Sequence, residues 1–157
     1  MKKTLPAKAG LENTPGYYIR RLQQIAVAIF LQETDEFGLT PVQYAALETI
    51  ASLSNIDQRT LARQIGQDTS TIGGVIDRLE SRGLVQRNPS ENDRRVHLLT
   101  LTYEGKNTLQ KVSPAVKKAQ ELILSPLDSK DQIEFMRMLK ILVNENNELS
   151  RAPKITQ

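Results

Sequence analysis

The chain has no cysteine, no tryptophan and a single histidine among its 157 residues. The absence of cysteine excludes disulfides, thiolate metal sites, a cysteine nucleophile and thiol redox sensing. One histidine excludes a histidine-rich metal site and leaves little basis for histidine catalysis. The sequence also lacks a nucleophile–base pair at a recognisable spacing, a G-x-G-x-x-G sequence and a P-loop. We therefore expect no enzyme, no catalytic residues, no cofactor and no metal.

Long hydrophobic runs are also absent, so no segment reaches the length needed to cross a membrane. The N-terminal MKKTLPAKAG has no hydrophobic segment of a signal peptide after its lysines. These absences predict a cytoplasmic protein with no membrane partner. The net charge of +3 and the pI near 9.2 are compatible with nucleic-acid binding.

Residues 68–101 carry the most informative pattern. Asp68 supplies a side-chain oxygen for a helix start, and Gly83 supplies a helix stop. Between them, apolar residues recur at i, i+3, i+4 and i+7 and predict one buried stripe: Ile72, Val75, Ile76 and Leu79. The opposite face carries small residues and can approach another surface closely: Thr69, Ser70, Gly73 and Gly74.

Two short strands, 84–87 and 95–101, are expected after this helix, with a turn-rich polar tip at 88–94 between them. A capping box opens a preceding helix over 40–53, and a short helix reaches about Ile65. A helix sized for the major groove beside an arginine-tipped β-ribbon predicts a winged helix-turn-helix.

Both ends of the chain carry helices with more apolar residues than one core-facing stripe needs: residues 16–36, and two helices within 102–149. A monomer would leave this surface in water, so we expect a homodimer built from these helices.

The predicted fold class is mainly α (α+β), a winged helix-turn-helix with N- and C-terminal dimerisation helices. Residues 40–101 form the DNA-binding lobe of a single unit that spans 16–157, and residues 1–15 form a flexible arm.

Four short blocks follow one another at a specific spacing: Asp77-Arg78-Leu79-Glu80, Arg82-Gly83-Leu84-Val85, Asp93-Arg94-Arg95 and Leu101-Thr102. In these blocks the chain resembles the MarR family of bacterial transcription regulators, and the similarity covers residues 16–149. The resemblance implies a homodimer that binds a pseudo-palindromic operator in double-stranded DNA. It also implies that a small, often aromatic, ligand binds between the dimer helices and the DNA-binding lobe and loosens the grip on DNA.

The recognition helix departs from this family, which often has a Thr-Arg pair where the chain has Gly73-Gly74. Two glycines inside a helix cost roughly 1 kcal/mol each relative to alanine. Either they let the backbone lie close to a base, or they are simply tolerated. Base readout is then expected from the neighbouring polar residues: Gln67, Thr69, Ser70 and Thr71.

At the wing tip we expect Arg94 and Arg95 to enter the minor groove or to contact phosphates. The resemblance implies that the Asp93 carboxylate orients the arginine; the alternative is a solvated turn in which Asp93 and Arg95 pair. Arg78 is a further candidate DNA contact, although Arg78 and Arg82 also suit ordinary surface ion pairs. The same two interpretations stay open for two arginines of the short helix: Arg59 and Arg63.

Effector binding is predicted from one face of the first helix, where Tyr17, Arg20 (or Arg21) and Gln24 recur at i, i+3 and i+7. With Tyr44 from the next helix they suit a partly apolar pocket that holds one cation. A guanidinium binds a carboxylate bidentately, and tyrosine adds a ring and a hydroxyl, so an aromatic acid such as a hydroxybenzoate fits this chemistry. The alternative is that the tyrosines fill the dimer core and the arginines form salt bridges across it.

The sequence therefore predicts a dimeric, sequence-specific DNA-binding repressor that a small aromatic acid releases. The alternative is a winged-helix module that binds proteins and neither DNA nor a ligand. Strong weakening of duplex binding by salt would favour the first, because neutralised phosphates release counterions. His97, on a wing strand, is interpreted as structural.

Overall fold

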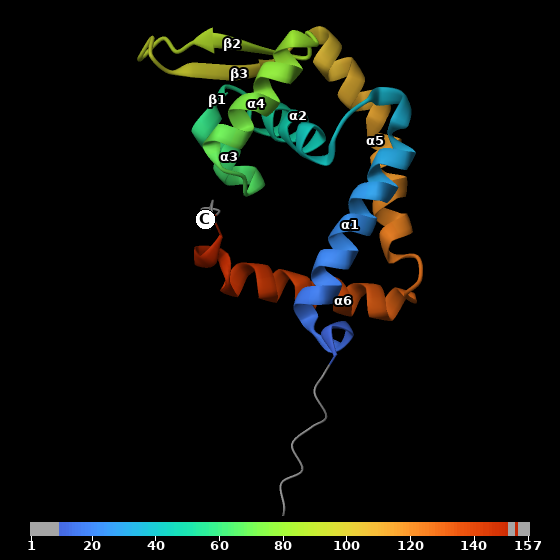
Figure 1. Cartoon of the computed structure of the whole chain (residues 1–157). Helices are drawn as coiled ribbons and strands as arrows, with labels where there is room; N and C mark the ends of the chain where they lie inside the picture. Colours follow the sequence, from blue (N-terminus) through green and yellow to red (C-terminus); the bar gives the residue numbers. More distant parts are fainter. Residues whose placement is uncertain (1–9, 151–152, 154–157) are drawn as a thin grey trace, which may run out of the picture.

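The computed structural model describes residues 10–150 and Pro153, which fall into a winged lobe and a group of longer helices (Figure 1). The winged lobe contains, in order, α2 (Pro41–Leu53), β1 (Ile56–Asp57), α3 (Gln58–Ile65), α4 (Thr69–Ser81), β2 (Val85–Pro89) and β3 (His97–Leu101). Its strands form an antiparallel sheet in the order β1-β3-β2. β2 and β3 extend beyond the helices as a wing (Figure 1). The predicted winged helix-turn-helix is confirmed.

Capping residues fix where these helices begin and end. Thr40 and Gln43 form the predicted capping box, in which each side chain accepts from the other residue's N–H, at 3.3 and 3.0 Å. Asp57 opens α3 by accepting from the Thr60 N–H at 2.7 Å. Gly66, at φ +69°, ends α3 in the left-handed conformation and turns the chain into α4.

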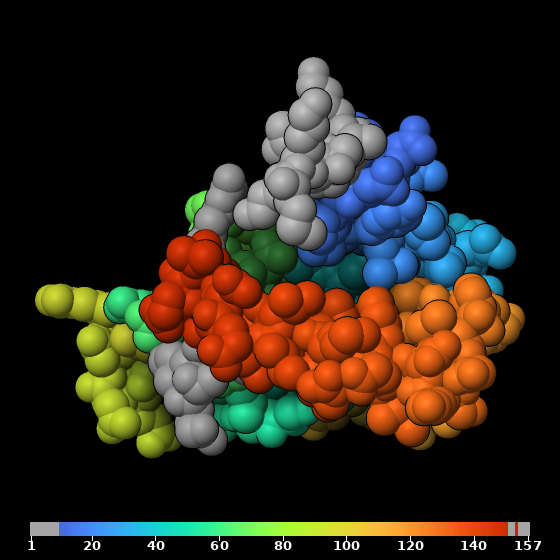
Figure 2. Space-filling model, turned by 90° about the horizontal axis from the view of Figure 1, so that it is seen from below, coloured from blue at the N-terminus to red at the C-terminus, as the bar shows by residue number. Residues whose placement is uncertain are grey.

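The longer helices form the second group. α1 (Pro15–Glu33) packs along α5 (Tyr103–Leu124), and α6 (Ser129–Glu145) crosses them at their far end (Figure 1). Figure 2 shows α6 stretched across one face of the molecule. A salt bridge of 2.8 Å between Glu33 and Lys118 ties the end of α1 to α5.

The apolar core lies within the winged lobe and extends to the middle of α5. Its fully buried side chains include Leu47, Ile50, Leu61, Ile72, Ile76, Leu79, Leu99 and Val112. The apolar stripe predicted for α4 is therefore confirmed. α6 contributes no buried residue. Within residues 10–150 and Pro153, no helix is long and apolar enough to cross a membrane.

Several predicted boundaries are corrected. α1 ends at Glu33 rather than 36, because the Thr34 hydroxyl donates to the Phe30 carbonyl at 2.8 Å and a 3-10 turn, η2 (Asp35–Phe37), follows. α6 likewise ends at Glu145 and gives way to η3 (Asn147–Leu149).

In the last part of the arm predicted for residues 1–15, η1 (Leu11–Asn13) precedes the start of α1 at Pro15. Residues 1–9 lie outside the described residues. Strand β1 is not expected from the sequence. Ile56 and Asp57 form a strand only because they pair with Leu99 and Leu98 of β3.

Candidate nucleic-acid interface

Asp68 organises the amino-terminal end of α4. Its carboxylate accepts hydrogen bonds from the Thr71 N–H at 2.8 Å and from the hydroxyls of Ser70 and Thr71, each at 2.6 Å. These bonds, with that of Ser70 the strongest, hold the pKa of the Asp68 carboxyl well below its usual range. Because both hydroxyl hydrogens go to Asp68, Ser70 and Thr71 offer only lone pairs to a base edge. We therefore expect Ser70 and Thr71 to accept hydrogen bonds from amino groups of the bases, such as adenine N6 or cytosine N4.

The two glycines of α4 have different surroundings. A Cβ on Gly73 would lie 3.1 Å from Nε2 of Gln58 in α3, and that nitrogen donates to the Thr69 carbonyl at 3.1 Å. A Cβ on Gly74 would meet nothing within 4 Å, and Gly74 is exposed. Gly73 thus lies where α3 packs on α4. Close approach to DNA stays a prediction for both Gly73 and Gly74.

Four polar residues expected near DNA lie around one hollow of about 360 Å³ at the turn between α3 and α4: Arg59, Arg63, Gln67 and Thr69. Pro153, near the C-terminus, also lines it. Both arginines are exposed and form no salt bridge with any other residue that the structure describes. Their guanidinium groups are therefore available to phosphates.

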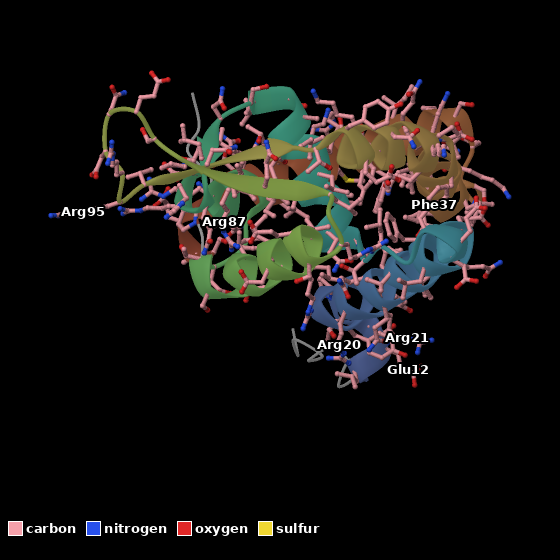
Figure 3. The ribbon with its side chains drawn as sticks, turned by 90° about the horizontal axis from the view of Figure 1, so that it is seen from above. Glu12, Arg20, Arg21, Phe37, Arg87 and Arg95 are labelled. Carbon is pink, nitrogen blue, oxygen red and sulfur yellow. The ribbon has the colours of Figure 1, made fainter. Side chains whose placement is uncertain are left out.

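The wing tip is shaped by Asp93. Its carboxylate accepts from the backbone N–H of Arg95 at 2.9 Å, and its carbonyl accepts from the Val96 N–H at 2.9 Å. The carboxylate therefore fixes the turn and does not pair with the Arg95 guanidinium. Figure 3 shows Arg95 at the outer end of the wing. Within residues 10–150, Arg94 and Arg95 form no salt bridge.

Arg87 is a residue of this surface that the sequence analysis misses. From β2 it donates to Asp77 at 2.6 Å and also to Glu80, both in α4. Partial burial lowers the pKa of the Arg87 guanidinium, but the hydrogen bonds and charges of these two carboxylates outweigh it and raise the pKa. These two ion pairs of Arg87 attach the wing to α4 and neutralise two carboxylates beside the predicted DNA-facing surface. No local pattern reveals them, because only the folded lobe brings the three residues together.

Arg78 and Arg82 differ, although the sequence suggests the same roles for both. Arg78 is exposed on α4 and forms no salt bridge with a described residue. Arg82 donates from its two terminal nitrogens to the carbonyls of Phe37 and Gly38, each at 2.8 Å. The expected surface ion pair is thus wrong for Arg82.

Tyr17 and Arg21 line a groove of about 600 Å³ between α1 and α6. Its other walls are mainly apolar and include Ile19, Leu22, Ile25, Phe135, Leu139 and Leu142. Arg20 does not line it; its guanidinium carbon lies 5.8 Å from the centre of the Tyr17 ring, at cation–π distance. Figure 3 shows Arg20 and Arg21 at the same end of α1. The groove therefore joins one tyrosine and one cation of the predicted set.

Gln24 and Tyr44, also predicted for this pocket, do not line the groove. The Tyr44 ring packs against Phe30 with centroids 6.1 Å apart, and its hydroxyl donates to Glu48 at 3.3 Å. Burial first, and Glu48 second, raises the pKa of Tyr44. Phe30 follows Tyr17 by thirteen positions in α1, about 20 Å along a helix. A pocket that joins Tyr44 to Tyr17 is therefore wrong within one chain.

In the described part of the chain, no group of three or more His, Cys, Asp or Glu side chains is arranged so that it could hold a metal ion. His97 is exposed on β3, opposite Pro89 in the wing. The described residues form a helix-turn-helix and a wing whose tip carries two exposed arginines, Arg94 and Arg95.

Comparison with known proteins agrees with this architecture. The model of the MarR family matches residues 39–97, which is most of the winged lobe. The chain is 30% identical over 152 residues to the HTH-type transcriptional repressor NicR of Pseudomonas putida, an alignment that covers 92% of this chain and 96% of NicR.

Two solved structures show the same fold. The PcaV transcriptional regulator from Streptomyces coelicolor, in complex with its natural ligand, is 30% identical with a TM-score of 0.78, over 87% of this chain and 96% of PcaV. The transcriptional repressor CouR, bound to a 23-mer DNA duplex, is 26% identical with a TM-score of 0.81, over 89% and 99% of the two chains.

The fold and these comparisons define a winged-helix transcription regulator. The chain belongs to the MarR family, whose members are transcription regulators and not enzymes.

Proposed function

We propose that two copies of the chain form a homodimer that binds a pseudo-palindromic operator in double-stranded DNA and represses transcription in the cytoplasm. The observation that carries the proposal is the exposed side of α4. It presents Gly74 and the lone pairs of Ser70 and Thr71, in the same lobe as exposed arginines of α3 and of the wing tip: Arg59, Arg63, Arg94 and Arg95. NicR is a repressor and CouR is solved on a DNA duplex, which supports the same role here.

A second copy is inferred from the apolar surface of α1 and α6. Tyr18 and Ile19 are 60% and 61% exposed, and Ile133 and Val143 are 73% and 65% exposed. Monomeric soluble proteins rarely expose apolar surface on this scale. A two-fold axis through these helices would direct two copies of α4 into successive major grooves about 34–36 Å apart.

The test of DNA binding is Arg95→Ala in a gel shift, with Lys130→Ala on exposed α6 as the matched loss of one cation. We expect Arg95→Ala to weaken operator binding roughly tenfold or more, most strongly on A·T-rich flanks, while circular dichroism and the dimer are unchanged. Footprinting should protect two half-sites one helical turn apart. Unchanged affinity would contradict the wing assignment, and no duplex binding even at low salt would indicate a protein-interaction module instead.

We further propose that the effector is a small aromatic carboxylate, such as a hydroxybenzoate, held by Arg21 in the α1–α6 groove, which Glu12 also lines. Tyr17 lines the same groove as this arginine, and the guanidinium carbon of Arg20 lies 5.8 Å from the centre of the Tyr17 ring. The apolar walls suit an aromatic ring, and the guanidinium suits a carboxylate. PcaV, solved with its natural ligand, supports a ligand-responsive regulator.

Calorimetry over benzoates, hydroxybenzoates and their amides tests the effector. The acid should bind, and a coupling of about 1–3 kcal/mol should weaken operator binding roughly 5- to 150-fold, with the same factor in the reverse direction. Arg21→Gln should abolish this response and keep DNA binding, whereas Arg20→Gln should reduce it less. Equal affinity for the acid and its amide would contradict the proposal that Arg21 binds the carboxylate of the effector.

A further inference from the structure

The carboxyl-terminal end of the recognition helix is attached to a distant part of the chain through one side chain. Arg82 follows directly after α4, and its two terminal nitrogens donate to the carbonyls of Phe37 and Gly38, both at 2.8 Å. These partners lie 44 and 45 residues earlier in the sequence. The contact is therefore a tertiary link and not a local cap.

The acceptors suit an arginine in particular. η2 ends at Phe37, and Gly38 follows in the left-handed conformation at φ +57°, so two successive carbonyls face outward together. A planar guanidinium presents two parallel N–H groups to such a pair, and forming the first bond orients the second. A lysine ammonium has no such fork.

The two ends of this link belong to parts with different tasks. Phe37 and Gly38 form the connection from α1, which supplies the exposed apolar surface, to the winged lobe. Arg82 lies between α4, the reading helix, and β2, the first strand of the wing. Leu39, directly after Gly38, is buried in the core, so the acceptor side of the link is firmly held.

We propose that Arg82 is a positioning residue: it holds the end of α4 to the segment that leaves α1, and operator affinity depends on this link without any contact between Arg82 and DNA. The inference rests on the proposed DNA-binding function. It makes Arg82 a determinant of how the dimer orients its two reading helices.

The rival role is a direct phosphate contact, and salt distinguishes the two. Each phosphate contact contributes about 0.9 to the slope of log affinity against log salt, so losing one per protomer lowers the slope of a dimer by about 1.8. A positioning residue neutralises no phosphate. Its loss should reduce affinity at every salt concentration and leave the slope unchanged.

The experiment measures operator affinity of the full-length dimer by fluorescence anisotropy over a salt series. We expect Arg82→Ala to weaken binding by about 2- to 30-fold, the range found for coupling elements that touch no ligand. Arg82→Lys should restore little, because a point charge replaces a phosphate contact but not a fork across two carbonyls. Arg78→Ala, on the exposed side of α4, is the contrast variant that should lower the slope, and Lys130→Ala should change neither quantity.

A second variant alters the acceptor end and carries no charge change. Gly38→Ala strains the left-handed backbone and should displace the two carbonyls. If both variants act through one link, the double variant should lose less affinity than the product of the two single losses.

Three results would overturn the proposal: unchanged affinity of Arg82→Ala, full rescue by Arg82→Lys with a lowered salt slope in Arg82→Ala, or multiplicative losses in the cycle. Melting temperature and sedimentation of each variant identify a loss due to unfolding, which would also count against it. A wild-type protein that binds no duplex would refute the proposed function itself, and is thus distinguished from failure of Arg82 alone.

Discussion

The winged lobe and two of the long helices, α1 and α6, use their apolar residues in opposite ways. α4 buries Ile72, Val75, Ile76 and Leu79 within the chain, whereas α6 buries none of its residues and α1 buries Phe30 alone. The lobe supplies most of the core, which Phe30 of α1 and Val112 and Val116 of α5 complete. α1 and α6 leave most of their apolar side chains exposed. This exposed surface is what a second copy would cover.

The largest effect that would test this contrast is on association. Leu142 is 54% exposed in the single chain and lines the α1–α6 groove. Leu142→Glu should raise the dissociation constant of the dimer roughly 1000-fold, since two leucines lose about 2 kcal/mol of burial each. Sedimentation equilibrium measures this, with Asn144→Glu as the control that adds the same charge at a polar position. A dimer as tight as the wild type would mean that α6 is not the associating surface.

A second change would disrupt the contact between the start of α5 and the winged lobe. A Cβ on Gly105, in the first turn of α5, would lie 2.0 Å from the carbonyl oxygen of Leu84. Gly105→Ala should lower the free energy of unfolding by about 3 kcal/mol, because backbone must move to admit the methyl group. Gly16→Ala in α1, where a Cβ meets nothing within 4 Å, is the matched control. Urea unfolding compares the two, and equal stabilities would show that the junction is loose.

The lobe itself is tested by its two helical glycines. Gly74→Ala should stabilise the protein by about 1 kcal/mol, since alanine is the better helix former. The same methyl group projects from the exposed face and should weaken operator binding. Gly73→Ala should gain less stability, because the Gln58 side chain must yield to it. Thermal melts and gel shifts of both variants give the comparison; if Gly74→Ala binds the operator as tightly as the wild type, no close backbone approach occurs there.

The smallest expected effect is the pH dependence of the α4 cap. The pKa of Asp68 is lowered in the folded state, so its contribution to stability is present above the unfolded value of about 4 and is lost as pH falls through the lower folded value. The free energy of unfolding of the wild type should therefore exceed that of Asp68→Asn above roughly pH 4, and the difference should disappear only below that pH. Denaturant titrations of both proteins at a series of pH values measure it. A constant difference down to strongly acidic pH would show that the charge of Asp68 adds nothing to the cap.

Features with local signals could be predicted from the sequence, and features made by distant pairing could not. The capping box at Thr40 and the stripe of α4 depend on neighbours within a few residues, and both are confirmed. Strand β1 exists only because Ile56 pairs with Leu99. The partners of Arg87 and Arg82 depend in the same way on how the lobe folds.

The candidate site shows the same division. Their residue types alone make Ser70 and Thr71 candidates for polar contacts with bases. Only the structure shows that both hydroxyls donate to Asp68, so that they can act toward a base only as hydrogen-bond acceptors. Helical spacing places Tyr17 and Arg21 at the same end of α1, and it gives no information about Tyr44, whose position depends on how α2 crosses α1 at Phe30.

The junction at Gly105 also has a mechanical consequence. α5 starts directly against the segment that follows α4: the Thr102 hydroxyl donates to the Gly83 carbonyl at 2.6 Å and its N–H donates to the Leu84 carbonyl at 3.1 Å. From there α5, which contains Pro114, runs for 22 residues toward α6, a length of about 33 Å. A tilt of about 5° at one end of such a lever displaces the other end by about 3 Å, the length of one hydrogen bond. A rotation of a few degrees where the long helices meet would therefore shift the start of α5, and the end of α4 that it touches, by about the length of one hydrogen bond. If α4 binds DNA as proposed, this shift would suffice to move its side chains away from the base edges.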